Sequence, residues 1–168
     1  MTAGQSRFSE ADKLYSNAKH LLAAGDIAGA ATLLEEITGR FENYGKAWTE
    51  LGNLLHHELN DLEGAIICFR KAMEVMPSYS PAYLGYADAL FLQEKYAEAN
   101  AIINQAMEIR GVRKDLGLHK SALLMESQGR YDEALKTYKE AILSSFSEQE
   151  ILECEKGINR CHIKKKYV

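Results

Sequence analysis

The sequence predicts an all-α fold in which antiparallel helix pairs stack into a solenoid and a further helix caps the C-terminal end. Two observations support this prediction. A short pattern recurs with its last alanine at positions 30, 65, 99 and 134, which are spaced by 35, 34 and 35 residues. Apolar residues recur at helical spacing between these alanines. Because one helix pair cannot bury its own apolar face, repeated pairs of this kind must stack on one another.

Each copy of the pattern begins with a glycine or polar turn and ends on a small residue that opens an apolar helix face. The four copies are Gly25–Ala30, Asn60–Ala65, Glu94–Ala99 and Gly129–Ala134. The small residues let two helices approach closely, and large residues fill the gaps between them. The chain has only 2 prolines, which permits long helices.

The second repeat, which contains the copy Asn60–Ala65, carries the fullest set of large, small and aromatic positions. Its residues are Trp48, Leu51, Gly52, Leu55, Ala65, Phe69, Ala72 and Pro77. This pattern and its period resemble the tetratricopeptide repeat family, and the resemblance covers roughly residues 10 to 143. It implies a right-handed superhelical solenoid that binds other proteins and does not catalyse a reaction.

The register of the repeats places each element. We expect one domain over residues 1–168, with repeats at about 10–43, 44–78, 79–113 and 114–146. Its paired helices are expected near 9–24, 27–40, 44–58, 62–75, 80–93, 96–109, 115–128 and 131–144. Pro81 fits the first turn of its helix, whereas Gly111 stands where a proline is expected between repeats and predicts a looser link.

A ninth helix is predicted over residues 147–163, followed by a basic tail at 164–168. Ser147 is followed three residues later by Glu150, which is the pattern of a capping box. Cys154 and Cys161 share one apolar face of this helix with neighbouring isoleucines. We expect that face to cover the fourth repeat, as a cap does at the end of an array.

Composition and charge narrow the class of protein. The chain has 168 residues, of which 46% are hydrophobic and 26% charged, as in a soluble globular protein. A net charge of −4 argues against a nucleic-acid partner. Three cysteines make no disulfide framework and favour a reducing compartment. With no apolar run of signal-peptide or membrane-span type, we expect a cytoplasmic protein without a membrane partner.

The sequence contains no catalytic or cofactor motif, so we expect neither an enzyme nor a bound cofactor or metal. Two clusters in the sequence contain residue types that can ligate a metal. His56 and His57 with His119 are interpreted as helix-end and groove residues, because adjacent histidines point in different directions. Cys154 and Cys161 with His162 are interpreted as core, since paired cysteine ligands usually lie two to four residues apart. The run of lysines at 164–166 is interpreted as a solvated terminus.

In tetratricopeptide arrays the first helix of each pair lines the concave surface. The resemblance therefore predicts a partner-binding groove from positions on those helices that lie outside the packing signature. These are Asp12, Tyr15, Lys19, Lys46, Thr49, Asn53, His56, Leu84, Asp88, Phe91, His119, Leu123 and Glu126. Apolar side chains among them suggest a surface for a partner.

Tetratricopeptide arrays that bind chaperone C-termini share a carboxylate clamp of lysine, asparagine and arginine residues. The matching positions here are Tyr15, Lys19, Glu50, Pro81 and Gly85, which do not reproduce that set. We therefore expect no clamp for a terminal carboxylate. The mixed groove suits an extended or helical segment with apolar anchors better.

Two functions are compatible with the sequence. The first is an adaptor or scaffold that binds a protein segment in the concave groove. The second is a chaperone or assembly factor that holds a client subunit, as the tandem-repeat secretion chaperones do. Self-association through the terminal repeats or the last helix is a further alternative.

Overall fold

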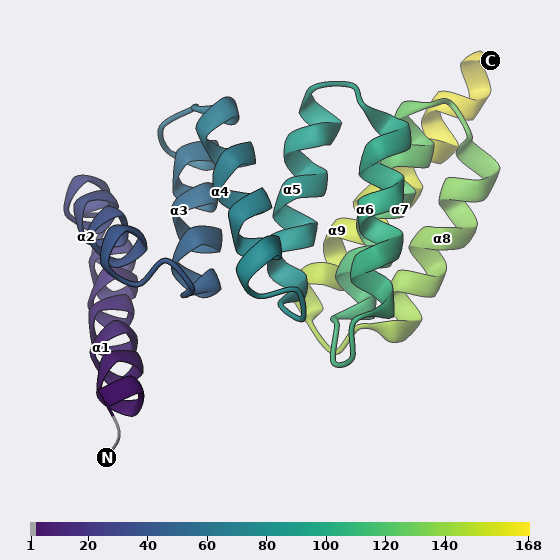
Figure 1. Cartoon of the computed structure of the whole chain (residues 1–168). Coiled ribbons are helices and arrows are strands. Elements are labelled where there is room, and N and C mark those ends of the chain that lie inside the picture. Colours follow the sequence, from purple (N-terminus) through teal and green to yellow (C-terminus); the bar gives the residue numbers. More distant parts are fainter. Residues whose placement is uncertain (1–2) are drawn as a thin grey trace. The chain divides into compact units, whose positions relative to one another are not determined.

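The computed structural model describes residues 3–168, with side chains from residue 10 onward. The described residues form α-helices and one short 3₁₀ helix, η1, and contain no strand (Figure 1). The elements are α1 (Ala3–Ala23), α2 (Ile27–Arg40), α3 (Gly45–His57), α4 (Leu62–Val75), α5 (Ser80–Leu92), α6 (Tyr96–Glu108), α7 (Lys114–Ser127), α8 (Tyr131–Ser144), α9 (Glu148–Lys164) and η1 (Lys165–Tyr167). The predicted all-α helical repeat is confirmed.

The predicted helix boundaries agree closely with the observed ones for α2 to α9. Helices α2, α4 and α8 begin and end at the predicted residues, and the others differ by one residue at one or both ends. The exception is α1, which begins at Ala3, well before the predicted start near residue 9. The apolar pattern marks only the part of a helix that packs, so it could not locate turns that extend beyond the repeat.

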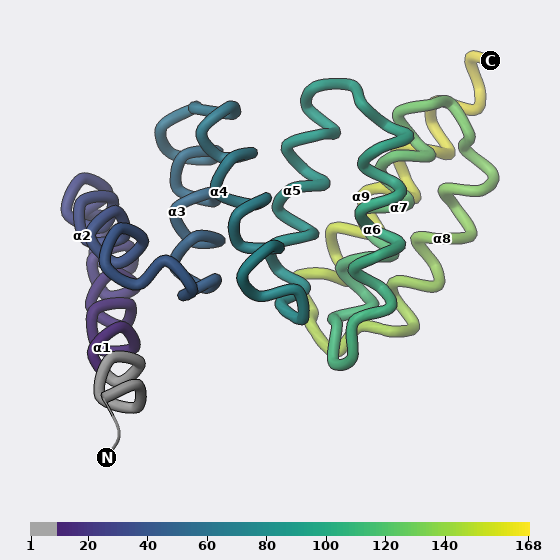
Figure 2. Tube along the Cα trace, in the orientation of Figure 1, coloured from purple at the N-terminus to yellow at the C-terminus, as the bar shows by residue number. Residues whose placement is uncertain are grey.

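The chain forms two compact units, residues 1–89 and 90–168. Within each unit, consecutive helices pack side by side (Figure 2). Helix α1 packs on α2 and α3 on α4 in the first unit, and α7 packs on α8 in the second. The single domain over residues 1–168 stays a prediction.

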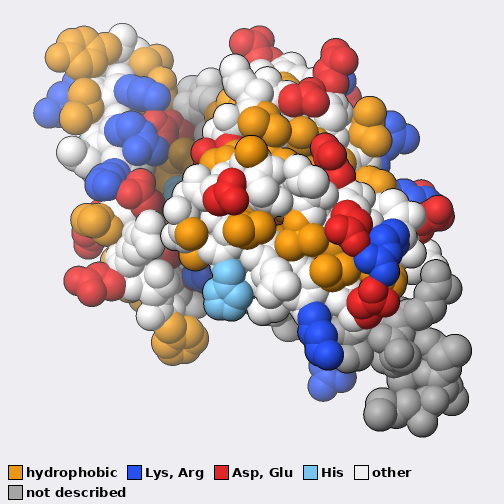
Figure 3. All heavy atoms as spheres, turned by 90° about the vertical axis from the view of Figure 1, so that its left-hand side faces the viewer, with side chains coloured by type: hydrophobic (Ala, Val, Ile, Leu, Met, Phe, Trp, Pro, Cys, Tyr) orange, Lys and Arg blue, Asp and Glu red, His pale blue; other side chains and the backbone are white. Residues whose placement is uncertain are grey.

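The α1–α2 pair carries hydrophobic side chains among charged ones on its outer side (Figure 3).

The turn inside each helix pair has a left-handed residue at the same place in the repeat. These residues are Gly25 (φ 80°), Asn60 (φ 56°), Glu94 (φ 58°) and Gly129 (φ 75°). Glycine adopts this conformation freely and asparagine tolerates it, but glutamate does so only with strain. The repeated turn therefore explains the recurring glycine or polar residue in the sequence.

The residue after this turn caps the next helix in the first two repeats. Asp26 accepts a hydrogen bond from the backbone N–H of Gly29 at 2.9 Å, and Asp61 accepts one from Gly64 at 2.9 Å. A Cβ atom on either glycine would clash with the capping carboxylate. In the fourth repeat Arg130 takes the aspartate's place and makes an ion pair with Glu133.

Aromatic residues on the second helices anchor the core of each unit. Phe69 of α4 is fully buried, and a Cβ atom on Gly52 or Gly85 would come within 2.8 Å or 2.5 Å of its ring. Tyr138 of α8 is likewise buried, and Gly157 of α9 lies against its ring. The cap helix α9 therefore packs on α8 through a glycine, as α5 packs on α4.

The N-terminus of α9 departs from the predicted capping box. The Ser147 hydroxyl accepts a hydrogen bond from the backbone N–H of Glu150 at 3.4 Å, as predicted. The Glu150 side chain does not return to Ser147 and instead pairs with His119 of α7. The Ser145 hydroxyl accepts the hydrogen bond from the Ser147 backbone N–H at 3.1 Å. Cys154 and Cys161 are fully buried, as predicted for core residues.

Candidate functional site

The structure places the predicted groove residues in different environments. Thr49, Leu84 and Glu126 are buried, so the expectation that they face an open groove is wrong. The Thr49 hydroxyl donates to the backbone carbonyl of Gly45 at 3.0 Å, which satisfies it within its own helix. The remaining predicted residues are partly or fully exposed.

Side chains of α1 meet Tyr44, which precedes α3, and Glu50 of α3 on one polar and aromatic surface. This surface is called the α1–α3 face. It consists of Asp12, Tyr15, Lys19, Tyr44 and Glu50. The Lys19 ammonium donates to Glu50 Oε1 at 3.2 Å, and the Tyr15 hydroxyl donates to Glu50 Oε2 at 3.3 Å. The Tyr44 hydroxyl donates to Asp12 Oδ1 at 2.5 Å. The rings of Tyr15 and Tyr44 meet edge to face, with their centroids 5.7 Å apart.

Burial and neighbouring carboxylates keep both tyrosines of this face protonated. Burial, followed by the charge of Glu50, raises the pKa of Tyr15 far above its ordinary value. Burial and the hydrogen bond to Asp12 raise the pKa of Tyr44 in the same way. Their hydroxyls act as fixed donors to the chain's own carboxylates. What this face offers to a partner is therefore the partly exposed Tyr15 ring and the ammonium of Lys19, whose side chain is 52% exposed.

The ion pair between Lys19 and Glu50 disfavours a carboxylate clamp at this position. Glu50 stands at a position where clamp-bearing arrays have asparagine, and it presents a carboxylate to the neighbouring lysine. A ligand carboxylate entering here would be repelled by Glu50 and would compete with it for Lys19. The geometry thus supplies a physical reason to expect no clamp for a terminal carboxylate.

Other predicted residues of the first unit extend along α3 and α5. Lys46, Asn53, His56 and Asp88 are half-buried. The His56 ring stacks on the His57 ring, with centroids 4.1 Å apart. The groove predicted from the sequence did not include Tyr44, although Tyr44 directly precedes α3. Glu50 was considered in the sequence only as a position of the carboxylate clamp.

Predicted residues of the second unit are largely engaged by the chain itself. The Phe91 ring packs edge to face on Tyr96, with centroids 5.7 Å apart, and Leu123 packs against the core. His119 pairs with Glu150 of α9. Because α9 covers the adjacent part of α7, His119 and Glu126 contact the cap helix, which the repeat register alone did not indicate.

Glu126 is the centre of a buried charge network. Its side chain is 5% exposed and accepts hydrogen bonds from the Arg160 guanidinium at 3.0 Å and 2.9 Å. The Lys164 ammonium donates at 2.9 Å and the Tyr138 hydroxyl at 2.7 Å. Burial opposes ionisation of Glu126, but the hydrogen bonds from Arg160, Lys164 and Tyr138 outweigh it and lower its pKa to about 2. This network fastens α9 to α7 and α8.

The basic C-terminal run is more ordered than predicted. Lys164 ends α9 and pairs with Glu126, and Lys165 pairs with Asp132 of α8. Lys164 and Lys165 are exposed, as interpreted from the sequence, but ion pairs hold both of them against preceding helices. Their partners on α7 and α8 come from distant segments and carry no local signal in the sequence.

Two sequence models of the tetratricopeptide repeat match the chain, one over residues 15–77 and the other over residues 117–144. Together they cover more than half of it. The chain belongs to the tetratricopeptide repeat family. It is similar to tetratricopeptide repeat protein 36 of Xenopus tropicalis, with 33% identity over 100 residues. The matched region is 56% of this chain and 50% of that relative, so the chain spans only half of the relative's length.

Solved tetratricopeptide structures share the fold of this array. A tetratricopeptide protein of Thermus thermophilus superposes with a TM-score of 0.75 at 21% identity, covering 88% of this chain and 81% of that one. PilF of Pseudomonas aeruginosa superposes with a TM-score of 0.81 at 15% identity, covering 96% and 72%. At these identities the likeness concerns the fold alone. In residues 3–168, no helix is both long and apolar enough to cross a membrane.

Proposed function

We propose that this tetratricopeptide array is an adaptor or scaffold that binds a segment of another protein on the α1–α3 face. Membership in a family of protein-interaction folds supports the general role. The observation that carries the specific proposal is that two predicted groove residues, Tyr15 and Lys19, are joined through Glu50 in one partly buried network. Such a network holds its side chains in fixed positions before a partner arrives, which lowers the entropy lost on binding.

The chemistry of the α1–α3 face suggests the kind of segment that it takes. Tyrosine rings bury a large area with little loss of side-chain freedom, and they are enriched at protein interfaces. Lys46 and Asn53 fall on the same side of α3 as Glu50 by helical spacing, and with Lys19 they supply a polar rim. We infer an extended or helical segment with an apolar anchor that packs beside Tyr15 and polar groups that reach this rim.

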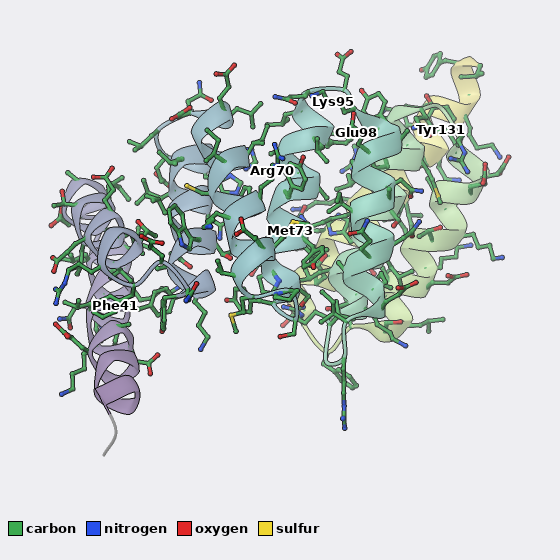
Figure 4. The ribbon with its side chains drawn as sticks, in the orientation of Figure 1. Phe41, Arg70, Met73, Lys95, Glu98 and Tyr131 are labelled. Carbon is green, nitrogen blue, oxygen red and sulfur yellow. The ribbon has the colours of Figure 1, made fainter. Side chains whose placement is uncertain are left out.

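The proposal is tested by comparing two triple variants in affinity capture from cells of the source organism. The groove variant carries Tyr15→Ala, Lys19→Ala and Asn53→Ala. The matched control carries Ile67→Ala, Arg70→Ala and Glu74→Ala on α4, where all three residues are exposed. Figure 4 labels Arg70 on this helix. Circular dichroism establishes that both variants remain helical. We expect a protein retained by the wild type and the control to be lost from the groove variant; retention by all three would refute the assignment of this face.

A second candidate, a chaperone or assembly factor, is favoured by one observation in the second unit. The end of α8 and the link to α9 expose two large apolar side chains, Leu143 and Phe146, almost completely. Exposed apolar side chains of this kind are suited to holding an unfolded or unassembled client. This function predicts that the chain slows client aggregation and that a Leu143→Ser, Phe146→Ser variant does so less. Equal activity of the variant would exclude this site.

Further aspects of the proposal follow from family and composition. We propose a cytoplasmic, non-enzymatic protein with no nucleic-acid or membrane partner. Its net charge of −4 supports the exclusion of nucleic acid. The cysteines at 68, 154 and 161 are free thiols, which suits a reducing compartment.

A further inference from the structure

Three metal-ligating side chains converge where the cap helix meets α7. His119 of α7 and Glu150 and Cys154 of α9 each offer a ligand atom, and these atoms lie within 4.8 Å of one another. Glu150 and Cys154 are four residues apart on one helix, so their side chains share a face. The Glu150 carboxylate already reaches His119 Nδ1. Because the third ligand comes from a segment about 30 residues away, no local spacing motif announces the cluster.

We propose that His119, Glu150 and Cys154 form a binding site for a divalent transition metal ion, with Zn²⁺ as its best match. A thiolate, an imidazole nitrogen and a carboxylate oxygen are the three ligand types that zinc takes from proteins. Sites with three protein ligands keep a fourth position for water. The His119 and Glu150 side chains are 17% and 14% exposed, which leaves an approach from solvent on their side of the cluster.

The charges around the cluster favour a cation. The carboxylates of Glu150, Asp115 and Glu153 lie near the buried Cys154 thiol, although Asp115 also pairs with Arg113 and Glu153 with Lys156. A dication bound at the cluster would stabilise the Cys154 thiolate and the charge of Glu150. Binding therefore releases the thiol proton of Cys154 to solvent as the sulfur–metal bond forms.

This site goes beyond partner binding. It joins α7 to the first turns of α9 near Ser147, whereas the Glu126 network joins them near the end of α9. An occupied site would add a second attachment of the cap helix to that of the Glu126 network. It would stabilise the folded chain by an amount that grows with the logarithm of the metal concentration. The contact between His119 and Glu150 makes the same connection in the metal-free chain.

Cobalt and zinc titrations of the full-length chain test the proposal. The protein is first stripped with a chelator and kept in a metal-free phosphine reductant. Co²⁺ is then added, since a thiolate ligand gives a charge-transfer absorption band that a His–Glu site lacks. We expect the band to saturate at one ion per chain and to disappear when Zn²⁺ is added. Absence of the band in the wild type would overturn the proposal.

Two ligand variants and a matched control locate the ion. Cys154→Ser keeps the size of the side chain but removes the thiolate, and His119→Gln alters a residue at the rim of the cluster. Both should abolish the band or weaken zinc binding by at least about tenfold. Cys161→Ser makes the same change at a buried cysteine two turns along α9 and should leave binding unchanged. A zinc affinity equal to that of the wild type in Cys154→Ser or His119→Gln, with circular dichroism showing a folded chain, would contradict the assignment.

Discussion

The network around Glu126 makes a quantitative prediction for the substitution Glu126→Gln. In the wild type, one buried carboxylate accepts hydrogen bonds from Arg160, Lys164 and Tyr138. The amide keeps the size of the side chain but removes its charge and one acceptor oxygen. Arg160 and Lys164 are about half exposed, so water can solvate their charges when the partner is lost. We therefore expect destabilisation without collapse of the fold.

The magnitude follows from the lowered pKa of Glu126. A shift from the ordinary value of 4.5 to about 2 corresponds to about 3 kcal/mol of stabilisation at neutral pH. The folded state has the lower pKa, so this stabilisation is present in full above pH 4.5 and is lost as the pH falls towards 2. About two fifths of it should be lost by pH 3.5.

Urea unfolding followed by circular dichroism, from pH 7 to pH 3.5, tests this prediction. Glu126→Gln should lower the free energy of unfolding by about 2–3 kcal/mol at pH 7, and the gap to the wild type should narrow towards pH 3.5. Glu155→Gln, at an exposed position of α9, serves as the control and should follow the wild type. A gap between Glu126→Gln and the wild type that stays constant with pH would refute the reasoning.

Three further substitutions test local structure through thermal or urea unfolding. Glu94→Gly should stabilise the chain by about 0.5–1 kcal/mol because it relieves a left-handed residue, and a destabilised variant would argue against that strain. Gly157→Ala should destabilise it by about 1–3 kcal/mol because the new methyl group meets the ring of Tyr138; a neutral effect would mean that α9 packs differently. Asp61→Ala should lose about 1 kcal/mol with the N-cap of α4, while Lys95→Ala, at the equivalent uncapped position of α6, should change little.

The repeat architecture was readable from the sequence because its signals are local and recur. The left-handed turn selects glycine or a polar residue at 25, 60, 94 and 129, and the alanine five residues later marks the close helix contact. Each copy supports the assignment of the others. The start of α1 lies outside this repeated pattern, which is why its predicted boundary was wrong.

The site was less predictable because its partners come from distant segments. Glu126 fits the groove register, yet Arg160 and Lys164 of the cap helix bury it. Glu150 fits a capping box, but its carboxylate pairs with His119 instead. Helix periodicity specifies which face a residue occupies, but it does not specify what covers that face.

Position-specific photo-crosslinking in cells of the source organism tests the central claim most directly. A photoreactive amino acid replaces Lys19 or Asn53 on the proposed partner-binding side, or Arg70 on α4 as the matched exposed control (Figure 4). We predict that positions 19 and 53 capture the same protein and that position 70 does not. Capture of that protein from position 70 alone, or equally from all three positions, would contradict the assignment of the α1–α3 face.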